Sequence, residues 1–269
     1  MSDLNLIARE FVASYAFVER NFYLVKRYLG WEIVFLVYTT VNALMMGLVG
    51  VDSGQKDRIL FLVVGALLWA FLSVIFETTS EAVAWERWEG TIEYTFMAPV
   101  HRLSHLGGTC LFGIIYGLVR TVIILGAAAL FFELDLSRAN LWAAFVVLAV
   151  SSLSFIGMGL LAAVFPLMSP EKGAQATHII QALLLLVSGV YYNINALPRW
   201  LQPLAKLSPA TYTLKAARLA LLEGVGLSQL TNLIIPLLAM GAVMIPLGLA
   251  IFTWAENHAM RTGKLKRNG

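Results

Sequence analysis

Residues 59–76 read ILFLVVGALLWAFLSVIF, an unbroken run without a charged side chain. A helix rises about 1.5 Å per residue, so this run nearly matches the roughly 30 Å hydrocarbon core of a bilayer. Five further apolar segments of comparable length occur along the chain. We therefore predict an all-α integral membrane protein with six transmembrane helices, at residues 31–51, 59–76, 105–131, 141–168, 176–192 and 232–254.

The composition of the chain agrees with a membrane location. Of its 269 residues, 59% are hydrophobic and 13% are charged, against about 45–50% and about 25% in soluble domains. A soluble fold of this size could not bury that excess, whereas lipid solvates apolar side chains on the outside of a protein. The net charge of +3 is modest, and no stretch resembles a nucleic-acid-binding module. We expect membrane lipid, and not nucleic acid, as a partner.

The two ends of the chain have patterns of their own. In residues 1–28, apolar side chains recur at helical spacing and charged ones fall between them, as in an amphipathic helix that lies in the membrane interface. A helix packed on another subunit is the alternative. Residues 261–269 form a basic tail, which suits an anionic inner leaflet. The six-helix domain is expected between these ends, at residues 29–260.

The long polar break at residues 193–231 is too apolar for a free loop. It contains many Leu and Ala residues as well as Trp200, and Pro198 and Pro209 are among the prolines that divide it into short pieces. Backbone at membrane depth that does not span must pack against protein or line water. We therefore predict short re-entrant helices between spans five and six, on the outer side.

The distribution of Lys and Arg indicates the orientation. With six spans both termini lie on one side, and with the termini inside the count is eleven on that side against seven outside. The excess of positive charge favours the cytoplasmic side. The expected location is therefore the cytoplasmic membrane, with both termini in the cytoplasm.

The motifs of soluble and intramembrane enzymes are absent from the sequence. There is no G-x-x-x-x-G-K-[ST] phosphate loop, no H-E-x-x-H and no G-x-S-x-G. His101 and His105 are four residues apart but have no third ligand nearby, and Cys110 is the only cysteine, so it packs as a small apolar residue. We expect no catalytic residue, no metal and no cofactor on this chain. An ion-coupled secondary transporter is the rival class, although spans one to four lack its paired acidic residues and broken helices.

Two stretches resemble the permeases of type-2 ABC exporters. The first is ERWEGTIE at 86–93, followed by APVHR at 98–102. The second is SGVYY at 188–192, LPRWLQP at 197–203 and LSPATY at 207–212, followed by Arg218. The order and spacing match that class over nearly the whole chain. Two departures are Trp88, where a charged residue is common, and Asn193, where a proline often stands.

The resemblance implies roles for named residues. Segment 77–104 would be the element that couples the permease to an ATPase, and Gly90 permits a sharp turn within it. The glutamates of this segment recur at three to five residues, as on a helix that projects into water. The coupling residues would be Glu86, Arg87, Glu89, Gly90, Thr91 and Glu93, and Tyr191 and Tyr192 would form an outer gate.

The resemblance also implies the partners. Two copies of a separate ABC ATPase subunit would bind ATP and Mg²⁺, and a second permease, identical or related, would complete the pathway. The expected function is outward movement of a drug-like or lipid-like amphiphile, with polysaccharide or lipid-linked glycan export as the alternative.

Arg120 is the one charge well inside a predicted span. A charge at that depth is costly and normally faces protein or water. Lining of the substrate path and structural hydrogen bonding are equally compatible with its position. Glu77 lies at a different depth by the helical rise, so it is a poor candidate for an ion pair with Arg120.

Overall fold

The computed structural model describes residues 3–52, 54, 56–98, 100–134 and 136–263. All regular structure in these ranges is helical, as the sequence predicts. The elements are α1 (Asp3–Arg27), α2 (Leu29–Asp52), α3 (Lys56–Glu89), α4 (Ile92–Met97), α5 (Arg102–Phe132), α6 (Leu141–Met168), α7 (Pro170–Val187), the 3₁₀ helix η1 (Ile194–Ala196), α8 (Gln202–Leu207), α9 (Pro209–Leu222) and α10 (Leu227–Arg261).

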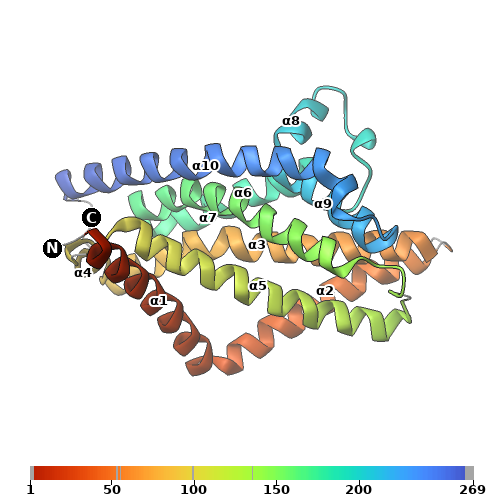
Figure 1. The fold of residues 1–269 in the computed structure, drawn as a ribbon, viewed down its shortest axis with the longest axis horizontal. Coiled ribbons are helices and arrows are strands. Elements are labelled where there is room, and N and C mark those ends of the chain that lie inside the picture. Colours follow the sequence, from red (N-terminus) through yellow and green to blue (C-terminus); the bar gives the residue numbers. More distant parts are fainter. Residues whose placement is uncertain (1–2, 53, 55, 99, 135, 264–269) are drawn as a thin grey trace.

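The long helices form a bundle around α3 (Figure 1). The run that predicted the membrane location is the centre of this bundle, since Leu62 to Leu68 are all buried. Helix α3 packs against α2, α5, α6 and α7, and α10 lies along α6. A helix that is apolar on every side is normally enclosed by other helices or by lipid, and α3 is enclosed by helices.

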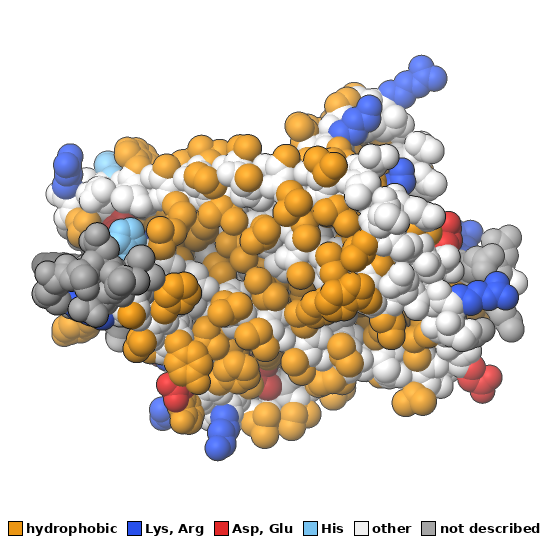
Figure 2. All heavy atoms as spheres, in the orientation of Figure 1, with side chains coloured by type: hydrophobic (Ala, Val, Ile, Leu, Met, Phe, Trp, Pro, Cys, Tyr) orange, Lys and Arg blue, Asp and Glu red, His pale blue; other side chains and the backbone are white. Residues whose placement is uncertain are grey.

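Among the residues that the structure describes, five helices are long and apolar enough to cross a membrane, namely α2, α3 from Arg58 onward, α5, α6 and α10. The sixth predicted span, 176–192, corresponds to α7, which begins earlier and ends at Val187. Its first turns contain charged and polar residues, so it does not reach the same apolar length. Figure 2 shows hydrophobic side chains over the middle of the visible face and most charged ones toward its edges. The chain is therefore a multi-pass membrane protein.

Both ends of the described chain lie beside α4, at one end of the bundle (Figure 1). We call this end the α4 end. Helix α1 runs obliquely from it and packs on α5, where the missing side chain of Gly108 leaves room for the Ser14 carbonyl group. Its other face exposes aromatic side chains such as Phe11 and Tyr15. Helix α1 thus packs on its own chain with an exposed apolar face, and its location in the membrane interface stays a prediction.

The segment predicted to be re-entrant has two different parts. Helix α9 is enclosed by α3, α6 and α10, with Pro209 buried at its first turn. The stretch through η1 and α8 projects away from the bundle (Figure 1), and Pro198 and Trp200 on it are exposed. Proline is favoured at the first turn because that turn's N–H groups have no helical partner.

The seam between α6 and α10 is closed by glycines. A Cβ at position 157 would lie 2.6 Å from the Met244 Cβ and 2.7 Å from its carbonyl carbon, and Gly248 meets Leu160 in the same way. Small residues let transmembrane helices approach closely and gain van der Waals contact. The close packing of α6 against α10 therefore depends on Gly157 and Gly248.

We expect Gly157→Val to destabilise the protein by about 1–3 kcal/mol, because the added side chain would overpack this seam. The measurement is the midpoint of thermal unfolding in detergent. Gly126→Val is the matched control, since a Cβ at position 126 meets nothing within 4 Å. Equal midpoints for the two variants would contradict the close packing of α6 on α10.

Candidate functional site

The predicted coupling segment forms the turn between α3 and α5. Helix α3 ends at Glu89, and Gly90 then takes a positive φ of 73°, a conformation that glycine adopts without steric cost. The Thr91 amide donates to the Glu86 carbonyl oxygen at 2.9 Å, which closes the turn before α4 begins. The sequence predicted this turn at Gly90, and the structure confirms it.

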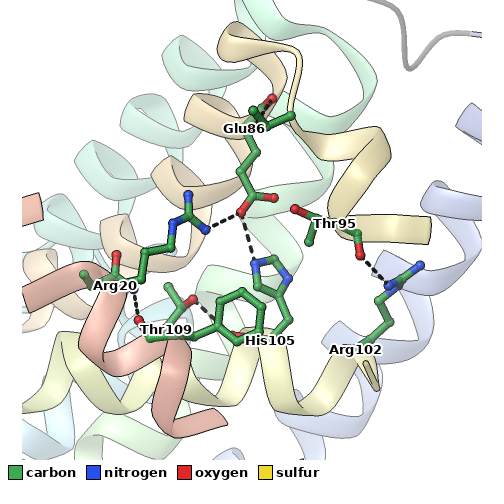
Figure 3. A network of polar contacts seen from close by, with 9 residues as sticks. Arg20, Glu86, Thr95, Arg102, His105 and Thr109 are labelled. Atoms are coloured by element: carbon green, nitrogen blue, oxygen red, sulfur yellow. Dashed lines mark hydrogen bonds and ion pairs between the residues drawn. The ribbon is translucent and has the colours of Figure 1, made fainter. Parts of the chain in front are cut away.

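Glu86 does not project into water as the spacing of the glutamates predicted. It is 2% exposed, and its Oε1 accepts a hydrogen bond from Arg20 Nη1 at 2.9 Å. His105 Nε2 lies 3.3 Å from the same oxygen. Figure 3 shows Arg20 and His105 pointing toward the Glu86 carboxylate. Glu86 therefore faces the interior, where Arg20 of α1 and His105 of α5 contact its carboxylate. We call Arg20, Glu86 and His105 the buried triad after its two buried members, since the side chains of Glu86 and His105 are 2% and 4% exposed whereas that of Arg20 is 44% exposed.

Arg87 is also inside the protein, with 1% of its surface exposed. Its guanidinium nitrogens have no hydrogen-bond partner among the described residues, although Glu93 acts on it electrostatically. Burying an unpaired charge costs free energy. Any surface contact made by the coupling segment must therefore use residues other than Glu86 and Arg87 while this fold persists.

Several exposed residues of the segment lie at the end of α3 and on α4. Trp88 is 61% exposed and Tyr94 is 72% exposed. Large exposed apolar side chains grouped beside charged ones mark interaction surfaces. We call this surface the α4 patch, and it consists of Trp85, Trp88, Glu89, Glu93, Tyr94 and Met97.

Arg102 ties α4 to the last helix. Its Nε donates to both carboxylate oxygens of Glu256 on α10, at 2.9 and 3.0 Å, and its Nη2 donates to Glu256 Oε1 at 2.6 Å. The same guanidinium donates to the carbonyl oxygens of Phe96 at 2.8 Å and Thr95 at 3.4 Å, at the carboxyl end of α4. Sequence reasoning missed Glu256, although a lone carboxylate in an apolar helix signals a buried partner.

Glu10 attaches α1 to the start of α5. Its Oε2 accepts hydrogen bonds from the Ser104 hydroxyl at 2.5 Å and from the His101 amide at 3.1 Å. The Ser104 hydroxyl is the main reason that the pKa of Glu10 is held below its ordinary value of 4.5. The carboxylate form is therefore the one that fastens α1.

We expect acid to release α1. A carboxyl whose pKa is lower in the folded protein contributes stability that is present above its ordinary pKa and lost as the pH falls through the lowered pKa. The protection of α1 amides against hydrogen exchange, measured relative to their intrinsic rate at each pH, should fall on acidification below pH 4.5. In Glu10→Gln the exchange should already be faster at pH 7. If Glu10→Gln matches the native protein at both pH values, Glu10 does not fasten α1.

Arg120 joins α5 to α2. Its Nη1 donates to the Tyr116 hydroxyl oxygen at 3.0 Å, and its Nη2 donates to Thr39 Oγ1 at 2.9 Å. The Tyr116 hydroxyl in turn donates to Glu32 of α2. Glu77 does not take part in these contacts, as the sequence predicted. The structure thus shows structural hydrogen bonding by Arg120, and lining of a substrate path stays a prediction.

Tyr191 and Tyr192 follow the end of α7, and both are half-buried. Arg218 of α9 donates to the carbonyl oxygens of Gly189 at 3.0 Å and Val190 at 2.5 Å, directly before the tyrosines. Its guanidinium carbon lies 3.5 Å from the centre of the Phe61 ring. Arg218 therefore fixes the backbone that carries the predicted gate.

Only some of the residues predicted for the outer gate and the re-entrant helices lie together in the structure. A hydrogen bond of 2.8 Å between the Ser188 and Ser208 hydroxyls places the end of α7 beside Pro209. Pro198 and Trp200 lie on the projecting stretch instead. Within the described ranges, no three His, Cys, Asp or Glu side chains are grouped as metal ligands.

Comparison with known proteins agrees with this architecture. A family profile described as ABC-2 type transporter matches residues 7–222, which is more than half of the chain. The match contains both the α4 patch and the segment of Tyr191 and Tyr192. No curated protein matches the chain at a significant level. The chain therefore belongs to the ABC-2 type transporter family, as a membrane permease component.

Proposed function

We propose that the chain is the permease subunit of an ATP-driven exporter whose ATPase is a separate subunit that docks on the α4 patch. In this proposal the α4 end lies in the cytoplasm, α7 is the sixth span, and the chain resides in the cytoplasmic membrane. Two ATPase copies bind ATP and Mg²⁺, and a second permease of the same or a related sequence faces this one. Glu89 and Glu93 contact the ATPase directly, whereas Glu86, Arg87, Gly90 and Thr91 hold the patch in place.

The α4 patch is the observation that carries the proposal. It combines exposed aromatic side chains with two carboxylates at the polar end of a membrane bundle. Aromatic residues supply most of the binding free energy in protein interfaces, with a polar rim around them. Because α4 is short and is held by Gly90 at one end and Arg102 at the other, a partner on it can displace it as a unit.

An amphipathic substrate, drug-like or lipid-like, fits the composition of the spans. Their faces are largely apolar, and Glu32 of α2 and Arg120 of α5 are engaged with each other through Tyr116. Because these two charged side chains are bound to each other, the remaining lining of the spans is apolar and suits an amphiphile. A polysaccharide or lipid-linked glycan is the alternative cargo, and it would require more polar groups along the path.

The test is co-purification. The chain is expressed with the product of a neighbouring reading frame that encodes an ABC ATPase, and the purified pair is assayed for ATP hydrolysis in nanodiscs. Bifunctional cross-linking from Glu93→Cys should capture the ATPase. Amphiphiles should stimulate hydrolysis and glycans should not. A chain that binds no ATPase, or whose cross-links arise only from the opposite end of the bundle, would refute the proposal.

A further inference from the structure

Arg102 of α5 and Glu256 of α10 form an ion pair, and Arg102 also holds the carboxyl end of α4. Glu256 is 3% exposed, and Arg102 contacts both of its carboxylate oxygens while donating to two carbonyl oxygens of α4. Charge-assisted hydrogen bonds with two contacts fix geometry more strongly than single neutral ones. A displacement of α4 must therefore either carry Glu256 along or break this set of hydrogen bonds.

Glu256 lies near the carboxyl end of a helix that extends to the other end of the bundle. Helix α10 has 35 residues, which corresponds to about 50 Å at the helical rise. Its first turns pack against α9, and Leu230 is fully buried there. One continuous helix thus connects the α4 end with the segment that carries Arg218.

Arg218 continues the connection to the predicted gate. It is on α9, and it holds the carbonyl oxygens of Gly189 and Val190 directly before Tyr191. Its contact with Phe61 fixes the same guanidinium against α3. A shift of α9 relative to α3 would therefore pull this guanidinium away from Phe61 or from the Gly189 and Val190 carbonyls, and so change how the backbone before the tyrosines is held.

We propose that Arg102 and Glu256 are positioning residues that transmit the movement of α4 through α10 and α9 to the Tyr191–Tyr192 segment. This inference rests on the proposed function, because it requires an ATPase that displaces α4. The buried triad is a separate connection, since it joins α3 to α1 and α5 and makes no described contact with α10. The two connections meet on α5 but share no residue, so each can be broken by its own substitution.

The experiment measures nucleotide-dependent distances in the complex with its ATPase, by spin labels on the full chain in nanodiscs. Cys110 is buried and is the only native cysteine, so introduced cysteines can be labelled selectively. One label pair, Ala98→Cys with Lys172→Cys, reports on the carboxyl end of α4 from a position outside the α4 patch. A second pair, Asp52→Cys with Ser228→Cys, reports on the far end of α10. Ala98 is half-buried, and the other three positions are exposed.

With ATP and orthovanadate, both pairs should change distance in the native background. In Glu256→Gln the α4 pair should still respond, but the fraction of molecules shifted at the α10 pair should fall about tenfold, a typical coupling between distant sites. Glu223→Gln, the same substitution at an exposed position, should leave both responses intact.

The exchange of charges, Arg102→Glu with Glu256→Arg, separates transmission from simple support of the fold. It restores an ion pair between α5 and α10 but removes the guanidinium that donates to the α4 carbonyls. We expect normal thermal stability in this variant without recovery of the α10 response. Recovery, or a full α10 response in Glu256→Gln, would overturn the inference while leaving the proposed function intact. No response of α4 in the native protein would refute both.

Discussion

Glu86→Lys is expected to prevent stable folding of the α4 end, whereas Glu89→Lys, three residues further on, should leave the fold unchanged. Position 86 is buried beside Arg87, whose guanidinium has no hydrogen-bond partner among the described residues, so a lysine there would place a second cation in the interior without a carboxylate partner. An uncompensated charge in such a site costs about 3–5 kcal/mol. Position 89 is exposed, and a surface charge there is solvated.

The measurement compares the yield of monodisperse protein, the midpoint of thermal unfolding in detergent and hydrogen exchange of α1. Glu86→Lys should lower the first two and accelerate the exchange, since Arg20 would lose its partner on α3. Glu86→Gln, which removes the charge without reversing it, should fall between the native protein and Glu86→Lys. Equal stability of the variants at positions 86 and 89 would show that the buried triad does not hold α1.

Trp88→Ala combined with Tyr94→Ala is expected to weaken binding of the ATPase by at least about 100-fold, because two central aromatic residues at about 2 kcal/mol each normally dominate an interface. Both side chains are more than 60% exposed, so their removal should not affect the fold. The measurement is the dissociation constant of the purified pair in nanodiscs.

The matched control for this prediction is Trp142→Ala. Trp142 is 66% exposed, on the first turn of α6, and it lies outside the α4 patch. The Trp142→Ala protein should bind the ATPase with native affinity. If the control weakens binding as much as the double variant does, the docking surface is elsewhere on the bundle.

The buried and the exposed residues at the α4 end have different roles within one short segment. The buried triad and Arg87 hold the end of α3, while the α4 patch faces outward. Arg102 connects the patch to α10. Variants of the patch should therefore change affinity for the ATPase, and variants of Arg102 or Glu256 should change the response of α10 to the bound ATPase.

The turn at Gly90 was predictable because it depends on local rules of backbone geometry. The inward direction of Glu86 was not, because the glutamate spacing is the same whether the helix faces water or protein. Its partners Arg20 and His105 come from helices far away in the sequence. The link from Arg120 through Tyr116 to Glu32 was missed for the same reason.

The sequence alone determined that the chain is a helical membrane protein. Apolar runs of this length are stable only in lipid, and a backbone in lipid must satisfy its own hydrogen bonds. Only the tertiary structure decided which charges are buried, which aromatic residues remain exposed, and that Glu256 meets α4 through Arg102. Those outcomes depend on which faces of distant helices pack together, and hydrophobic periodicity does not specify the neighbour of each face.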